Sequence, residues 1–174
     1  MKNFEYCVYT YRHRKAMEYT ARRVIKDETL LKMLMPRILK HDMDKLIMYQ
    51  FLEKEDASRI HQQISEHHMT NNVKKDWYDK LEAVIDYESS GYTKTDKPLN
   101  AYDTIMRYKE AFPQYGLICD ELVGICRMLH INQSYKVQEI DPDYIAFFSQ
   151  YENVTEEMIL DEIKQYFNNL PKLS

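Results

Sequence analysis

The sequence contains few residues that interrupt helices, with only 3 glycines and 5 prolines among 174 residues. Residues that favour helix, such as Leu, Met, Lys, Glu and Ile, are plentiful. Alternation of apolar and polar residues with a period of two, which marks a half-buried strand, is nowhere sustained. These features predict an all-α fold. The length suits a single domain over residues 1–174 with one sizeable core.

Cysteine is scarce and long apolar runs are missing. The three cysteines, Cys7, Cys119 and Cys126, have no metal-ligand spacing. Cys119 and Cys126 lie seven residues apart in an apolar stretch, which indicates two core thiols on one helix face. A reduced, cytoplasmic setting fits this usage. The N-terminus meets charge too soon for a signal peptide, and no window approaches the ~20 apolar residues of a membrane span.

An excess of basic charge is also missing. The formal net charge is −4 and the pI is near 5.9, so we expect no extended nucleic-acid surface. The 15 tyrosines and 6 phenylalanines are scattered along the chain, as expected for half-buried helix faces. A homo-oligomer is compatible with this composition.

Apolar periodicity and capping signals predict the helices. They are expected at about residues 4–26, 27–36, 44–52, 57–69, 74–87, 100–112, 117–130, 142–151 and 155–167. Asp27 and Thr155 are the predicted N-caps of two of them. Pro36 predicts a break or a new helix start just before His41. The polar stretch at residues 89–98 is predicted to be irregular.

Side chains that can bind metals follow one another along the first half of the chain. They are His13, His41, Asp42, His67, His68 and Asp86. Imidazole nitrogen and carboxylate oxygen are good ligands for zinc, iron and manganese when several converge on one point. Adjacent helical residues differ by only ~100° around the helix axis, so the His-Asp pair can face one cavity. A helix-end hydrogen-bonded pair is the alternative for His41-Asp42, and a solvated basic turn is the alternative for His13.

This order of residues resembles the signature of the HD-domain superfamily of metal-dependent phosphohydrolases. In that signature a histidine on one helix precedes a His-Asp pair, and a later aspartate completes the site. The intervals here are 41 − 13 = 28 and 86 − 42 = 44 residues. The stretches HDMDK, HHMTNN and YTKTDKPLNAYD are most similar to a small bacterial and phage branch of HD-like proteins. The resemblance covers roughly residues 5–105, and the helices expected at about 117–168 lie outside it.

The resemblance implies a role for each matching residue. It implies His13, His41, Asp42 and Asp86 as metal ligands, with His67 and His68 as ligands of a second ion. It also favours Asp86 over the nearby Glu82 and Glu88. Asp42 and Lys45 are the implied catalytic residues, because a lysine three residues after the aspartate helps hold substrate phosphate in one branch of the family. The glutamate of the nucleotidase branch is absent, and no Gly-Tyr-Pro follows His68, which disfavours degradation of cyclic dinucleotides.

Further residues are assigned around this set. Lys45, Tyr92, Lys94 and Lys97 are expected to bind substrate, the last three from a loop at residues 92–97 that forms part of the pocket rim. His61 lies on the same predicted helix face as His68 but is placed outside the ligand set. His130 is given no role, because a histidine near a helix C-terminus also suits the helix dipole.

The expected function is hydrolysis of a small phosphorylated molecule, plausibly a nucleotide, by metal-activated water. A divalent ion lowers the pKa of bound water to ~7 and so supplies hydroxide at neutral pH. One or two ions fit, and the ligand types do not distinguish Mn, Fe, Zn, Co, Ni or Mg. Two alternatives use the same residues: an HD-type di-iron oxygenase, and a non-catalytic, metal-stabilised helical module that binds a nucleotide or a protein partner.

Overall fold

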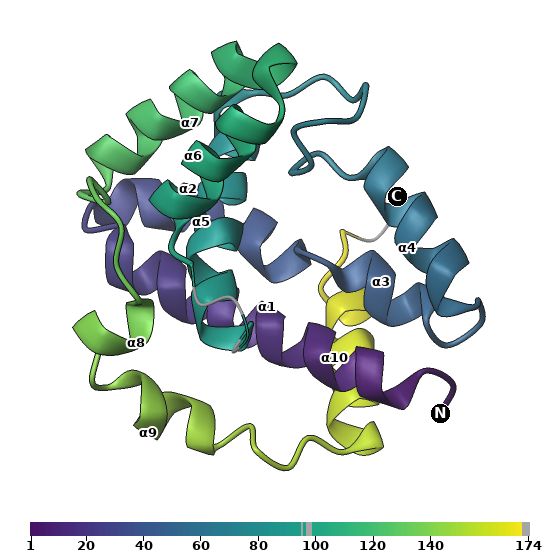
Figure 1. Cartoon of the computed structure of the whole chain (residues 1–174). Helices are drawn as coiled ribbons and strands as arrows, with labels where there is room; N and C mark the ends of the chain where they lie inside the picture. The colour runs from purple at the N-terminus through teal and green to yellow at the C-terminus, as the bar shows by residue number, and fades with distance from the viewer. Residues whose placement is uncertain (95, 97–98, 172–174) are drawn as a thin grey trace.

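Every regular element in the computed structural model is a helix. The structure describes residues 1–94, 96 and 99–171, and no strand occurs within these ranges. The elements are α1 (Phe4–Val24), α2 (Glu28–Lys40), α3 (Met43–Met48), α4 (Lys54–Ile64), α5 (Trp77–Thr93), α6 (Ala101–Ala111), the 3₁₀ helix η1 (Pro113–Tyr115), α7 (Gly116–Met128), α8 (Val137–Ile140), α9 (Tyr144–Ser149) and α10 (Glu156–Asn168). The prediction of an all-α helical bundle is confirmed (Figure 1).

Helices α1 and α5 form the centre of the bundle, and their mutual contact is the most extensive of any helix pair described. Helix α2 packs on both, and α6 and α7 cover the other side of α5. Helices α3, α4 and α10 gather around the N-terminal half of α1 (Figure 1). The functional residues therefore sit on a framework of long, mutually buried helices.

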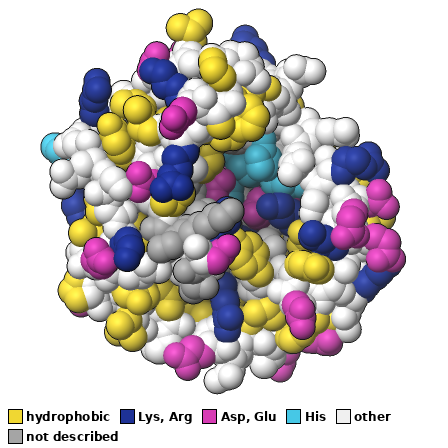
Figure 2. Space-filling model, viewed as in Figure 1, with side chains coloured by type: hydrophobic (Ala, Val, Ile, Leu, Met, Phe, Trp, Pro, Cys, Tyr) yellow, Lys and Arg dark blue, Asp and Glu magenta, His cyan; other side chains and the backbone are white. Residues whose placement is uncertain are grey.

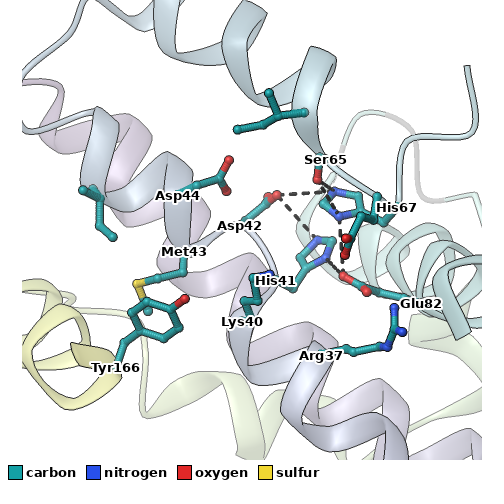
Figure 3. A pocket seen from close by; sticks show the side chains of 13 residues that line it. Arg37, Lys40, His41, Asp42, Met43, Asp44, Ser65, His67, Glu82 and Tyr166 are labelled. Atoms are coloured by element: carbon teal, nitrogen blue, oxygen red, sulfur yellow. Dashed lines mark hydrogen bonds and ion pairs between the residues drawn. The ribbon is translucent and has the colours of Figure 1, made fainter. Parts of the chain in front are cut away.

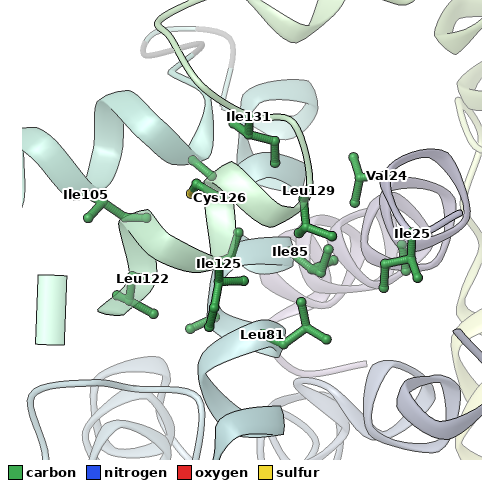
Figure 4. Packing of buried hydrophobic residues seen from close by; sticks show 14 of the residues in the cluster. Val24, Ile25, Leu81, Ile85, Ile105, Leu122, Ile125, Cys126, Leu129 and Ile131 are labelled. Carbon is green, nitrogen blue, oxygen red and sulfur yellow. The ribbon is translucent and has the colours of Figure 1, made fainter. Parts of the chain in front are cut away.

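Apolar side chains form two main clusters at opposite ends of α1. The larger one joins the end of α1 to α2, α5, α6 and α7, with Leu81, Ile85 and Ile125 near its middle (Figure 4). Full burial of such a side chain contributes about 1.5–3 kcal/mol. The smaller cluster joins the start of α1 to α3, α4 and α10 through residues such as Leu46 and Ile159. A third, mainly aromatic cluster joins α1 and α5 to α8 and α9.

Several local predictions are confirmed. Cys119 and Cys126 are both buried in the larger cluster and unpaired, as expected for core thiols. The side chain of Asp27 accepts a hydrogen bond from the backbone N–H of Leu30 at 2.8 Å, and so caps α2. Thr155 caps α10 in the same way through the N–H of Met158.

The break predicted at Pro36 is wrong, because α2 continues through it to Lys40. Proline within a helix costs about 3 kcal/mol. Burial of Leu34 and Ile38, on either side of the exposed Pro36, favours keeping the turn helical. As a result, α2 reaches the His41-Asp42 pair without interruption.

The prediction of an irregular segment at residues 89–98 is wrong for its first half. Helix α5 runs to Thr93, so Ser89, Gly91 and Tyr92 are helical. Gly91 allows α8 to approach closely, since a Cβ there would lie 2.8 Å from the side chain of Val137. Local sequence suggested a loop, whereas the glycine serves helix packing. Residues 95, 97 and 98 lie outside the described ranges.

The helix predicted at residues 57–69 is also wrong at its C-terminal end, since α4 stops at Ile64 and Ser65 is extended. The side-chain amide of Asn71 donates to the carbonyls of Gln62 and Ser65, at 2.9 and 2.7 Å. It thereby caps carbonyls that the ended helix leaves free. The following histidines lie in a loop that folds back toward α1 and α5. The short helix α8 was not predicted.

A buried ion-pair network connects α10 to the middle of α1. The carboxylate of Glu162 accepts hydrogen bonds from Arg14 at 3.0 Å and from Lys15 at 2.7 Å. The Arg14 guanidinium also donates to the carbonyls of Leu39 and His41. These carbonyls belong to the end of α2, where a helix has no intrahelical donors of its own. The C-terminal helix is therefore linked to the His41-Asp42 junction.

We expect Glu162→Gln to lower the free energy of unfolding by about 1–3 kcal/mol at pH 7, because a buried charged donor loses its partner. Burial opposes ionisation of Glu162, but Lys15 and Arg14 outweigh it and hold its pKa below the ordinary value of a glutamate. A depressed carboxyl pKa stabilises the fold above the unfolded-state value, and this contribution disappears as pH falls through the folded-state value. Urea unfolding at several pH values should show the two proteins converging in acid.

The matched control is Asp161→Asn, which removes an exposed ion pair with Lys164 on the same helix. Exposed pairs contribute roughly 0–1 kcal/mol. A Glu162→Gln effect that is no larger than the control, or that persists unchanged in acid, would contradict this account.

Among the described helices, none has the length and apolar character needed to cross a bilayer.

Candidate metal centre

Five of the six histidines of the chain gather at one place, and Asp42 and Asp86 are among the aspartates beside them. They are His13 in the middle of α1, His41 and Asp42 between α2 and α3, His61 in α4, His67 and His68 in the loop after α4, and Asp86 in α5. All except the partly exposed His68 and Asp86 are buried. Figure 2 shows histidine side chains at the bottom of a hollow on the face it displays, with basic and acidic side chains beside them.

The junction between α2 and α3 directs His41 and Asp42 into this cavity. His41 leaves the helical conformation with ψ 129°, and Asp42 is left-handed with φ 54°. Aspartate tolerates this region better than most residues, and a buried non-glycine residue held there often marks a functional site. Arg14 donates to the His41 carbonyl and supports the turn. Adjacent side chains therefore point toward one centre although the helix axis changes direction between them.

The first group of potential ligand atoms comes from α1, the α2–α3 junction and α5. His13 Nε2 lies 2.9 Å from Asp86 Oδ1. His41 Nε2 lies 3.7 Å from Asp42 Oδ1 and 4.0 Å from Asp86 Oδ1. Ligand atoms bonded at about 2.0–2.2 Å to one ion are separated by roughly 3.0–3.5 Å. Small movements of the four side chains predicted as ligands would thus bring their ligand atoms to the spacing that one shared ion requires.

The second group contains the histidines of α4 and the following loop. His61 Nε2 lies 3.0 Å from Asp42 Oδ1, and His67 Nε2 lies 3.6 Å from the same oxygen. His61, His67 and His68 each offer a nitrogen within 4.8 Å of those of the other two. Asp42 belongs to both groups, and its carboxylate has two oxygens. His61, which the sequence analysis placed outside the ligand set, thus contacts Asp42 directly.

Several buried atoms of this cluster have no hydrogen-bond partner within the described part of the chain. They are His41 Nε2, Asp42 Oδ1, His61 Nε2 and His68 Nε2. The 3.0 Å approach of His61 to Asp42 lacks hydrogen-bond geometry. Buried polar atoms without partners are costly, and lone-pair atoms of this kind that lie close together suit a bound cation. The buried His and Asp groups are thus close enough, and chemically suited, to hold a metal ion.

Carboxylates behind the histidines fix their ring orientation. Glu82 Oε1 lies 2.9 Å from His41 Nδ1, and Asp44 Oδ2 lies 2.8 Å from His61 Nδ1. When Nδ1 donates to the carboxylate, the Nε2 atom has a lone pair for a metal. Figure 3 shows His41 and His67 between the carboxylates of Asp42 and Glu82. A cavity of about 460 Å³ borders this side of the cluster.

The electrostatics favour neutral rings at His41 and His68 and ionised carboxylates, whereas at His61 the carboxylates of Asp42 and Asp44 outweigh burial and raise the pKa. Burial lowers the pKa of His41, and burial together with His67 lowers that of His68 to about 4. Burial opposes ionisation of Glu82, but hydrogen bonds from His41 and His67 outweigh it and lower its pKa to about 2. Metal binding requires deprotonated imidazole and carboxylate. His41, His68 and the carboxylate of Glu82 therefore have the required charge state at neutral pH.

We expect Glu82→Gln to weaken metal binding about tenfold. Residues that orient a metal ligand in this way typically contribute 10–100-fold to affinity, and glutamine retains a hydrogen bond to His41 while removing the charge. The check is metal affinity by competition with a chromophoric chelator. Glu66→Gln is the control, since Glu66 is exposed on the neighbouring loop. Equal affinities of Glu82→Gln and the wild type would show that Glu82 does not tune His41.

The predicted substrate-binding residues are placed differently from one another. Lys45 Nζ lies 2.9 Å from Asp42 Oδ2, at the edge of the cluster, and its side chain is 23% exposed. Tyr92 is a buried residue of α5 and not part of a loop, and its hydroxyl donates to Asp141 at 2.6 Å. Lys94 is exposed at the C-terminal end of α5. Lys97 lies outside the described residues.

Sequence reasoning did not identify three members of this arrangement: His61, Asp44 and Glu82. A signal existed for two of them. Glu82 precedes Asp86 by one helical turn, and His61 precedes His68 by seven residues. Asp44 gives no such pattern, because its contact with His61 joins α3 to α4. His130 has a left-handed backbone with φ 60° and belongs to none of the metal-capable groups found among the described residues.

Comparison of the chain with models of protein families, with curated proteins and with solved structures finds no match.

Proposed function

We propose that this protein is a metal-dependent phosphohydrolase of the HD type, acting on a small phosphorylated molecule. The observation that supports the proposal is the convergence of His13, His41, Asp42 and Asp86, which are separated by up to 73 residues (86 − 13). Two buried atoms among them, His41 Nε2 and Asp42 Oδ1, have no hydrogen-bond partner in the described part of the chain. The order of these residues along the chain is that of the HD signature. Structural burial alone would not leave His41 Nε2 and Asp42 Oδ1 without hydrogen bonds.

The residues divide the chemistry between them. When bound, a divalent ion would lower the pKa of a water molecule and polarise a phosphoryl oxygen. His13, His41, Asp42 and Asp86 would hold it, and Glu82 would orient His41. The carboxylates supply negative charge to balance the ion, and the partly exposed edge at Asp86 and Lys45 faces solvent. Substrate phosphate would enter from this edge.

Lys45 is the proposed phosphate-binding cation. Burial disfavours its charge, but Asp42 outweighs burial and raises the Lys45 pKa, so the ammonium group stays protonated at neutral pH. Its hydrogen bond to Asp42 holds it beside the cluster. Negative charge develops on the phosphoryl oxygens during in-line attack, and a nearby fixed cation stabilises it.

The test combines elemental analysis of the purified protein with a phosphate-release screen over nucleotides and sugar phosphates. The protein is stripped of metal and then reloaded separately with Mn, Fe, Co, Ni, Zn or Mg. Metal-dependent phosphate release that disappears in Asp86→Asn supports the hydrolase. Absence of release with every ion and substrate class would reject it.

The same experiment separates the two alternatives. The second histidine group favours a site able to hold two ions, which also suits a di-iron oxygenase. Two irons per chain with a mixed-valence absorption, and no phosphate release, would indicate that oxygenase. A stably folded protein that binds no metal would indicate a helical binding module.

We expect His61→Ala to remove one of two metal equivalents. His61 and His13 belong to different metal-capable groups that share Asp42, and two ions clamped by a shared carboxylate would be about 3.5–4 Å apart. His130→Asn is the control, because asparagine tolerates the left-handed backbone at that position. Metal content of the two dialysed variants is compared by mass spectrometry. Full metal content in His61→Ala, His67→Ala and His68→Ala alike would leave a one-ion centre only.

A further inference from the structure

An aromatic groove lies beside the metal centre, between the N-terminal half of α1 and helix α9. Its cavity volume is about 480 Å³, within the range of small-molecule sites. Its walls include Tyr9, Tyr92, Tyr144 and Phe148. Tyr9 and the neighbouring Ile145 are 42% and 63% exposed, so apolar surface is available to a ligand.

Tyr9 connects this groove to the metal centre. It precedes His13 by one helical turn, and the two rings are parallel within 1° with centroids 6.2 Å apart. Thr93, which also lines the groove, lies with its hydroxyl 3.4 Å from His13 Nδ1. Four residues of helix advance about 6 Å. That is roughly the span of the ribose that separates a 5′-phosphate from its base.

Hydrogen bonds and ring packing fix the position of Tyr92, which lines the groove. The hydroxyls of Tyr19 and Tyr92 both donate to the carboxylate of Asp141, at 2.8 and 2.6 Å. The ring of Phe148 packs against Tyr92 with centroids 5.4 Å apart. The aromatic faces are thus preorganised, which lowers the entropic cost of binding a planar group.

The wall also carries a cation with no acidic partner. Arg12 donates to the backbone carbonyls of Tyr151 and Glu152, and within the described ranges no carboxylate lies at ion-pair distance from it. Its guanidinium can stack or donate further hydrogen bonds. A planar ring with acceptor atoms is complementary to aromatic faces beside such a donor. The exposed carboxylates of Glu5 and Glu152 at the rim can accept from exocyclic amino groups.

We infer that this groove binds the base of a nucleotide whose phosphate lies at the metal centre. The inference rests on the proposed function and deepens it, since it places the base in a defined groove and assigns Tyr9 and Phe148 as specificity-determining residues. The base stacks on their exposed faces, and the ribose spans the turn of α1 between Tyr9 and His13. This gives the C-terminal helices α8 and α9, which lie outside the HD-like region, a role in substrate selection.

The test measures binding of adenosine, guanosine, cytidine, uridine and free ribose to the metal-loaded full chain by calorimetry. Nucleosides carry no phosphate, so they report on the groove whether or not the protein is a hydrolase. At least one nucleoside should bind tenfold or more tightly than ribose, because base stacking on aromatic side chains contributes strongly to affinity. Tyr9→Ala and Phe148→Ala should each weaken that binding about tenfold.

Two variants keep the test specific. Tyr9→Phe retains the ring and should bind like the wild type. Phe112→Ala removes an aromatic of similar exposure near η1, away from the groove, and should also bind like the wild type. Thermal melting identifies any variant that fails to fold, and Tyr9 is the less buried of the two sites. Nucleoside binding that equals ribose binding, or that Tyr9→Ala leaves unchanged, would overturn the inference. Phosphate release without nucleoside binding would reject the groove alone, and nucleoside binding without phosphate release would reject the hydrolase alone.

Discussion

Asp42→Asn should remove bound metal from this protein, with a loss of affinity of more than about 100-fold. Asp42 Oδ1 lies within 4 Å of nitrogens from His41, His61 and His67, so one carboxylate serves both ligand groups. Supporting residues alone contribute 10–100-fold, and a shared ligand should contribute more. Burial opposes its ionisation, but His41 and His61 outweigh burial and hold the Asp42 pKa well below its usual range. The carboxylate is therefore ionised and ready to bind a cation.

Asparagine is the informative replacement at this position. It has nearly the size of aspartate and tolerates the left-handed backbone at φ 54°, whereas alanine would add strain. Metal content is measured by elemental analysis, and circular dichroism reports whether the helices persist. Asp161→Asn, on the exposed face of α10, is the control. Retention of metal by Asp42→Asn would mean that the ion binds elsewhere.

Lys45→Ala should reduce kcat/KM for a phosphorylated substrate about 100-fold while leaving metal content nearly unchanged. The ammonium group contacts Asp42 Oδ2, whereas the histidine nitrogens approach Asp42 Oδ1. A protonated amine has no lone pair and cannot itself bind a metal. Loss of one preorganised donor to a transition-state oxyanion typically costs 10²–10³ in rate. Steady-state kinetics and elemental analysis on the same preparations test both parts of this expectation.

Lys164→Ala, which removes an exposed lysine of α10, is the matched control. A parallel loss of metal and activity in Lys45→Ala would show that Lys45 maintains the fold of the site. Unchanged turnover would show that Lys45 lies outside the path of the substrate. Lys45→Arg distinguishes charge from shape, because arginine keeps the charge but replaces a compact ammonium by a planar group.

The helices themselves were determined largely by local sequence. Scarce glycine and proline, apolar periodicity and the caps at Asp27 and Thr155 are local signals, and each was correctly interpreted. The errors occurred where a distant contact outweighed the local signal. Burial of Leu34 and Ile38 carries α2 through Pro36, and packing of Val137 against Gly91 keeps α5 helical. Such contacts join different helices, and the apolar periodicity within one helix does not predict them.

The sequence by itself determined the helical class and the supply of metal-binding side chains, because composition and periodicity are properties of the chain alone. Only the tertiary structure decided which of those side chains share a centre. His61 and Glu82 enter it because α4 and α5 bring them to Asp42 and His41, at 3.0 and 2.9 Å. Tyr92 belongs to α5 and not to the predicted loop for the same kind of reason. Its hydroxyl donates a hydrogen bond to Asp141, which lies 49 residues further along the chain. A cavity forms where helices cross, and no local pattern encodes the crossing.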